Sequence, residues 1–169
     1  MLKRIVSVAC CAVLLLGVAV GGAGAEEKKA EKPTVSLKVG DPVVDVMVDG
    51  KSLAKEVGQK GVVIWAQSAC SACRHELSNL GNLKEKFKDT KFVVIMVDVG
   101  GKEMASRVVD KYGVDKVATV LYDPEFQSGE KYGVYSTPYA VVVKGGKVVE
   151  RLGNLNPREN QLAAALGKL

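Results

Sequence analysis

Two cysteines separated by two residues, Cys70 and Cys73, follow an apolar stretch in the middle of this 169-residue chain. The stretch, Val62 to Trp65, is typical of a buried strand, and apolar residues at helical spacing follow the cysteines. We therefore expect Cys70 at the start of a helix, where unpaired backbone N–H groups and the helix dipole favour negative charge. The thiolate is the nucleophile of disulfide exchange, and a second cysteine one turn later can resolve the mixed disulfide that the first one forms. The pattern predicts thiol–disulfide chemistry at this pair.

The first 25 residues have the pattern of an export signal. Lys3 and Arg4 precede an almost wholly apolar run of 16 residues, Ile5 to Val20, and the small residues Ala23-Gly24-Ala25 form a cleavage site. A membrane-spanning helix needs ~20 apolar residues, so we favour a cleaved signal over a retained anchor. A lipoprotein signal at Cys10 is less favoured because that cysteine lies inside the run. We expect a periplasmic or other extracytoplasmic protein, with membrane contact only if the signal is retained.

Cleavage after residue 25 leaves 144 residues, enough for one domain with its own core, and leaves Cys70 and Cys73 as the only cysteines. A disulfide that closes so short a loop removes little chain entropy, so chemistry explains the pair better than stabilisation does. A structural zinc site needs about four ligands, and His75 is the one histidine of the chain. We therefore expect no metal and no cofactor. Cleavage also lowers the net charge from +5 to +3 without leaving a basic stripe, so we expect no nucleic-acid partner.

The sequence divides into residues 1–25, a charged linker of low complexity at 26–34, and a folded domain at 35–169. Apolar runs predict strands, and helical periodicity predicts the helices between them. The expected strands are 43–48 with its return at 51–53, 62–65, 92–97, 117–122, 139–144 and 147–152. The expected helices run from the cysteines to about residue 88, over 104–112 with Gly113 as the cap, over 127–132, and onward from an N-cap at Asn156-Pro157.

Strands that alternate with helices and end in a hairpin predict an α/β fold. Continuous apolar strands such as 92–97 are typical of a sheet that is buried on both faces. We therefore expect a mixed central sheet with helices on both faces. An N-terminal hairpin should precede it, and a helix–strand unit over 102–123 should be inserted near its middle.

Four segments in this order resemble the exported TlpA/ResA-type thiol–disulfide oxidoreductases of the thioredoxin superfamily. They are Asp49-Gly50-Lys51-Ser52-Leu53, Cys70-Ser71-Ala72-Cys73-Arg74-His75-Glu76, the unit at 102–123, and Tyr132-Gly133-Val134-Tyr135-Ser136-Thr137-Pro138. The resemblance covers residue 39 to the C-terminal end and implies a thioredoxin-like fold. Some positions differ from the family: Ala69 stands where Trp is usual, Ile64 where thioredoxin buries an acid, and Ser71-Ala72 where proline is common.

The resemblance implies a role for each site residue. Cys70 is the attacking thiolate and Cys73 is the buried resolving thiol. Glu76 transfers the proton of Cys73, which burial would assist by raising the pKa of the carboxyl group; a surface glutamate paired with a basic residue is the alternative. Pro138 is expected to be cis, and the backbone of Thr137 is expected to pair with an extended substrate segment.

Four further features of the sequence have a structural interpretation. We expect Trp65 to pack in the core below the cysteines and His75 to face solvent from the helix. Tyr139 either shapes the substrate groove or packs as a core aromatic residue. Asp123-Pro124 is most simply a turn.

The expected function is an exported thiol–disulfide oxidoreductase, with a reductase favoured. Its substrates would be cysteines of other exported proteins, such as apocytochromes c during cytochrome c maturation. A reductase in an oxidising compartment needs electrons from a membrane thiol donor. The alternatives are an oxidase that forms disulfides, and a non-catalytic module of thioredoxin fold that binds a metal or a partner.

Overall fold

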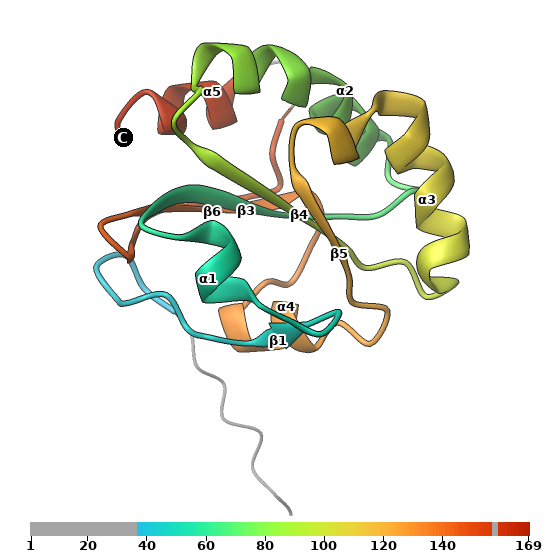
Figure 1. Ribbon diagram of the computed structural model, residues 1–169, viewed down its shortest axis with the longest axis horizontal. Helices are drawn as coiled ribbons and strands as arrows, with labels where there is room; N and C mark the ends of the chain where they lie inside the picture. Colours follow the sequence, from blue (N-terminus) through green and yellow to red (C-terminus); the bar gives the residue numbers. More distant parts are fainter. Residues whose placement is uncertain (1–36, 157–158) are drawn as a thin grey trace, which may run out of the picture. The chain divides into compact units, whose positions relative to one another are not determined.

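A computed structural model describes residues 37–156 and 159–169 of the chain (Figure 1). The predicted signal at 1–25 and the predicted linker at 26–34 lie outside the described residues, as does Pro157. Within the described ranges, no helix combines the length and the apolar character that crossing a membrane requires.

The domain is built on a mixed sheet of five strands. From one edge to the other they are β5 (Thr119–Tyr122), β4 (Lys91–Met96), β3 (Lys60–Ala66), β6 (Tyr139–Lys144) and β7 (Lys147–Gly153). β3, β4 and β5 are parallel, whereas β6 is antiparallel to β3 and β7 is antiparallel to β6. The β6–β7 turn consists of Gly145 and Gly146, which both have positive φ, as a tight two-residue hairpin requires.

Helices cover both faces of this sheet, as Figure 1 shows. α2 (Ser71–Lys86), α3 (Gly101–Tyr112) and α5 (Gln161–Leu166) lie on one face, and α1 (Leu53–Val57) and α4 (Gln127–Tyr132) lie on the other. Side chains alternate along a strand, so β3 supplies both cores: Val62 and Ile64 pack in one cluster, and Val63 and Trp65 pack in the other. A 3-10 turn, η1 (Val114–Lys116), precedes β5. The predicted α/β fold with helices on both faces of a mixed sheet is confirmed.

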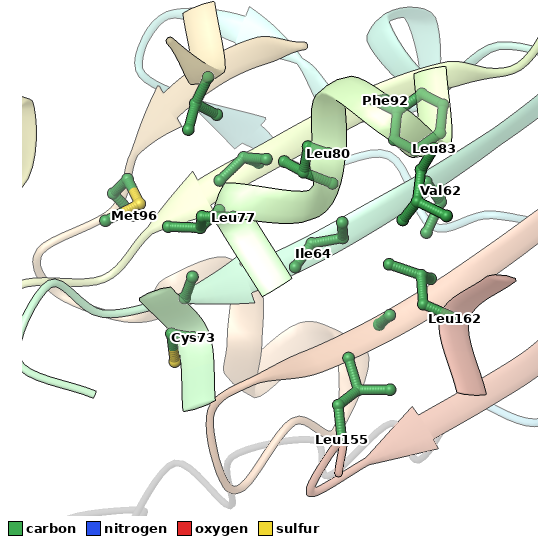
Figure 2. Close-up of a cluster of buried hydrophobic side chains, with 14 of the residues drawn as sticks. Val62, Ile64, Cys73, Leu77, Leu80, Leu83, Phe92, Met96, Leu155 and Leu162 are labelled. Carbon is green, nitrogen blue, oxygen red and sulfur yellow. The ribbon is translucent and has the colours of Figure 1, made fainter. Parts of the chain in front are cut away.

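The core beneath α2 fixes the position of this helix against the sheet. Cys73, Leu77 and Leu80 pack in one cluster with Val62 and Ile64 of β3, and all five residues are at most 1% exposed (Figure 2). Truncating one such buried leucine to alanine typically costs ~2–5 kcal/mol. The second cysteine is therefore a member of the main hydrophobic core and is held by the packing of α2.

The N-terminal hairpin is shorter than the sequence predicts. β1 (Met47–Val48) and β2 (Lys51–Ser52) pair around the Asp49-Gly50 turn. The return strand stops at Ser52 because this residue caps α1, with its Oγ accepting a hydrogen bond from the N–H of Lys55 at 3.3 Å. The expected strand over 43–46 is wrong. The N–H of Val43 donates to the carbonyl of Gly146 at 3.0 Å, so the segment starts beside the β6–β7 turn and reaches the hairpin only at Val46, whose carbonyl accepts from the N–H of Leu53 at 2.9 Å.

α5 begins later than the sequence predicts. The predicted N-cap is Asn156, whereas α5 starts at Gln161. The N–H of Asn156 donates to Gln161 Oε1 at 3.2 Å, and its carbonyl accepts from the N–H of Glu159 at 3.0 Å, so Asn156 belongs to a turn before the helix. The predicted inner face of the helix, Leu162, Ala165 and Leu166, is buried.

Candidate active site

Cys70 and Cys73 form a disulfide at the start of α2. Cys70 is the N-cap residue of the helix, and the N–H of Cys73 donates to Cys70 Sγ at 3.1 Å. Cys73 is 0% exposed, whereas Cys70 is partly exposed. The two cysteines therefore differ in their environment: Cys70 is partly accessible to solvent, and the core encloses Cys73.

The sheet topology brings a distant segment to this disulfide. β6 is antiparallel to β3 and begins at Tyr139, which pairs with Trp65, so the residues before β6 lie beside the loop after β3. The Thr137–Pro138 peptide bond is cis, as predicted, and the carbonyl oxygen of Thr137 lies 3.7 Å from Cys70 Sγ. Among the described residues, no backbone group bonds to the N–H or C=O of Thr137. Apart from the contact with Cys70 Sγ, these two groups have no hydrogen-bond partner among the described residues.

Glu76 lies one turn after Cys73 on α2 and is 7% exposed. Burial raises the pKa of its carboxyl group, an effect that the nearby His75 partly opposes. No residue of the described ranges donates a hydrogen bond to this carboxylate. Glu76 is buried, in contrast to the alternative of an exposed glutamate in a surface ion pair. His75 itself is exposed, as predicted. A buried carboxyl group with a raised pKa is suited to moving a proton near neutral pH.

Trp65 packs in the core as predicted, within a polar network that the sequence does not reveal. Its Nε1–H donates to Ser128 Oγ at 2.9 Å, and the Ser128 hydroxyl donates to Asp123 Oδ2 at 2.5 Å. Asp123 also accepts from the N–H groups at the start of α4, and it is 7% exposed. Asp123 is therefore a buried helix cap in addition to a turn residue. The Trp65 ring packs against Tyr132 and Tyr139, with ring centroids at 5.1 and 6.4 Å, which places half-buried Tyr139 with the core aromatic residues.

Three polar residues beside the cysteines escape sequence reasoning. Gln67 and Ser68 form the loop that precedes Cys70, and buried Asp98 follows β4 and binds Ser68. One signal in the sequence points to Asp98: it is the first polar residue after the apolar run of β4. Because β3 and β4 are parallel neighbours, their carboxyl ends meet at the same edge of the sheet, where the cysteine loop begins.

A groove with a volume of about 270 Å³ adjoins residues 135–138, which end in the cis-proline and are called the cis-proline segment below. Its walls come from the ends of β3 and β4, the residues before α4, and the cis-proline segment itself. Two of its residues, Val99 and Tyr135, are 89% and 78% exposed. The lining residues are Gln67, Val97, Val99, Pro124, Glu125, Phe126, Tyr135, Ser136 and Thr137.

A family model described as the AhpC/TSA family matches residues 33–156 of the chain. The chain belongs to the AhpC/TSA family. The match includes the cysteine pair, Glu76 and the cis-proline segment. No curated protein sequence is significantly similar to this family member.

Solved structures share the fold of this AhpC/TSA-family chain. A putative thiol:disulfide interchange protein DsbE from Chlorobium tepidum is 26% identical with a TM-score of 0.67, over 78% of this chain and 100% of that one. A putative protein disulfide isomerase from Bacteroides thetaiotaomicron is 22% identical with a TM-score of 0.65, over 78% and 87%. A secreted Mycobacterium tuberculosis disulfide oxidoreductase homologous to E. coli DsbE is 20% identical with a TM-score of 0.60, over 76% and 96%.

These comparisons agree with the resemblance to TlpA/ResA-type proteins. The fold is thioredoxin-like, and the family, the neighbours and the Cys70–Cys73 pair together identify a thiol–disulfide oxidoreductase.

Proposed function

We propose that this AhpC/TSA-family protein is an exported reductase that acts on disulfides of other exported proteins, apocytochromes c awaiting haem among them. The observation that carries the proposal is the setting of Cys70. Cys70 is partly exposed at the N-terminus of the 16-residue helix α2, and its Sγ accepts a hydrogen bond from the N–H of Cys73 at 3.1 Å. Oriented N–H groups at this helix end favour the thiolate over the thiol, and the thiolate is the attacking form.

In the first step, the Cys70 thiolate of the reduced protein attacks one sulfur of a substrate disulfide. The substrate S–S bond breaks, one substrate sulfur leaves as a thiolate, and the other is joined to Cys70. An extended substrate segment aligns by pairing with the free backbone groups of Thr137, whose carbonyl oxygen is 3.7 Å from Cys70 Sγ. Because Cys73 is 0% exposed, the incoming disulfide reacts at Cys70 alone.

In the second step, Cys73 loses its proton and attacks Cys70 Sγ. The bond between Cys70 and the substrate breaks, and the second substrate sulfur leaves as a thiolate. The substrate has then gained two electrons, and the protein holds the Cys70–Cys73 disulfide that the structure shows. Glu76 accepts the proton of Cys73, a task for which its burial one turn further along α2 and its raised pKa are suited.

A further cycle needs two electrons from outside. A thiol pair of a membrane protein is the proposed donor, since an oxidising compartment offers no other pool of reducing thiols. The location is supported by the predicted signal at 1–25 and by the fold that the chain shares with a protein described as secreted.

The proposal is tested by the reduction of insulin and by the reduction potential of the Cys70/Cys73 pair. We expect turnover with a thiol donor, abolished in Cys70→Ser, and a potential close to the ~−270 mV of thioredoxin. A potential near ~−120 mV would favour the oxidase that forms disulfides. Binding of a metal or a partner without any exchange would favour the non-catalytic module.

A further inference from the structure

The loop before Cys70 is fixed at Ser68 by a buried carboxylate. The N–H of Ser68 donates to both oxygens of Asp98, at 2.9 and 3.2 Å, and the Ser68 hydroxyl donates to Asp98 Oδ1. Asp98 is 4% exposed, so these bonds are formed away from bulk water. On its other side, the carbonyl of Ser68 accepts from Arg74 Nη1 at 2.8 Å. One residue of the loop is therefore joined both to the end of β4 and to the first turns of α2.

The preceding residue joins the same loop to the cis-proline segment. Gln67 Nε2 donates to the carbonyl of Val97 at 3.3 Å, and Gln67 Oε1 accepts from the hydroxyl of Thr137 at 3.3 Å. Within the described part of the chain, this bond and the contact of Cys70 Sγ with the Thr137 carbonyl are the side-chain contacts between the loop and the cis-proline segment. The carbonyl of Gln67 also accepts from the N–H of Cys70 at 3.3 Å.

These contacts bear on the distance that matters for exchange. Cys70 and Thr137 belong to segments that are 67 residues apart in sequence, and the carbonyl oxygen of Thr137 lies 3.7 Å from Cys70 Sγ. A substrate that pairs with Thr137 brings its disulfide to Cys70 Sγ in a reactive geometry only if the loop before Cys70 is held in one conformation. A displacement of about 1 Å in such an arrangement is enough to slow a reaction ~100-fold.

We propose that Asp98 is a positioning residue for the attacking sulfur. Acting through Ser68, it holds the loop that carries Gln67 and Cys70, and thereby sets Cys70 Sγ against the substrate-pairing backbone of Thr137. This inference rests on the proposed exchange reaction. It assigns to Asp98 a role in the encounter with polypeptide disulfides, and no role in the acidity of the Cys70 thiol.

The test compares two reagents over a range of pH with pre-reduced full-length protein. Iodoacetamide measures the reactivity of the Cys70 thiolate alone, whereas insulin must also align with Thr137. For Asp98→Ala we expect the insulin rate at its high-pH plateau to fall about tenfold. For Ser68→Ala we expect a smaller fall, because the Ser68 N–H still donates to both oxygens of Asp98. The plateau and the midpoint with iodoacetamide should stay unchanged. The double variant should be no slower than Asp98→Ala, because Asp98→Ala already removes every Ser68–Asp98 hydrogen bond, including the one that Ser68→Ala removes. Asp98→Asn keeps one acceptor oxygen and should retain more of the insulin rate than Asp98→Ala.

A matched control comes from another serine–carboxylate pair. Ser52 Oγ donates to Asp45 Oδ1 at 2.7 Å before α1. Ser52→Ala should reduce the stability of the domain and leave both rates unchanged.

Four results would overturn the inference about Asp98. A shifted iodoacetamide midpoint with an unchanged insulin plateau would mean that Asp98 acts through its charge. A loss of stability with both rates unchanged would mean a structural role. Wild-type protein that fails to reduce insulin would overturn the proposed function, and this inference with it. An active wild type with unaffected variants would overturn the inference alone.

Discussion

Replacing Ser128 with alanine removes the hydroxyl group that connects Trp65 to Asp123 at the start of α4. The hydroxyl accepts from Trp65 Nε1 at 2.9 Å and donates to Asp123 Oδ2 at 2.5 Å, and Ser128 is 0% exposed. A hydrogen bond to a charged group is worth ~1.5–3 kcal/mol, and leaving a buried donor such as the indole N–H unpaired costs ~1–3 kcal/mol. Asp123 keeps the N–H groups of Gln127 and Ser128 as donors, which limits the damage. We therefore expect the free energy of unfolding to fall by about 3 kcal/mol.

Urea unfolding followed by tryptophan fluorescence measures this loss directly. Trp65 is the one tryptophan of the chain and is 0% exposed in the folded state, so its emission reports on the core that the substitution disturbs. Ser78→Ala is the control, because the Ser78 hydroxyl donates to the carbonyl of His75 at 2.7 Å on the exposed side of α2. That variant should differ from wild type by ~0.5 kcal/mol or less. A loss below ~1 kcal/mol in Ser128→Ala would show that another acceptor satisfies the indole N–H, and would refute the reasoning.

Three further outcomes are expected. Cys73→Ser should accumulate a mixed disulfide between Cys70 and insulin, visible on a non-reducing gel, because no resolving thiol remains; its absence would contradict the assigned order of attack. Because burial raises the pKa of Glu76, the folded protein keeps this proton to a higher pH than the unfolded chain does, so stability falls as pH rises through that window. Glu76→Gln should remove this fall in urea titrations and slow the exchange ~100-fold; unchanged exchange across pH would exclude Glu76 as the proton acceptor. Arg151→Lys should lower the free energy of unfolding by about 2 kcal/mol in urea, since an ammonium group cannot replace a guanidinium group that donates to three backbone carbonyls and lies 5.6 Å from the Tyr139 ring. If the free energy of unfolding of Arg151→Lys equals that of wild type, these bonds do not stabilise the fold.

The elements that carry a strong period were predictable from sequence. β3 and β4 are continuous apolar runs in the sequence because helices cover both faces of the sheet. α2 and α3 have apolar residues at helical spacing because one side of each helix packs on the sheet. α4 was placed correctly at 127–132. The short pieces were not placed as well. A cap at Ser52 starts α1 where the pattern suggests more strand, and turn contacts of Asn156 delay α5, because single side-chain bonds decide these boundaries.

The residues of the candidate active site also differ in how far the sequence predicts them. Cys70, Cys73 and the cis bond before Pro138 could be predicted because they belong to a motif that depends on local spacing and on resemblance. The contacts of Asp98 and Ser128 could not, because each joins residues from different strands or loops, and no periodicity marks them. The contact of Asp98 with Ser68 follows only once the strand order places the carboxyl ends of β3 and β4 side by side.

The antiparallel pairing of β6 with β3 also determines when the candidate active site is completed during synthesis of the chain. A chain is synthesised from its amino end, so both cysteines emerge long before Thr137, which follows Cys70 by 67 positions. If substrates pair with Thr137 as proposed, the thiols have no neighbouring main chain on which a substrate can align until the β6–β7 hairpin packs against β3. On this proposal, substrate alignment becomes possible only when folding is complete.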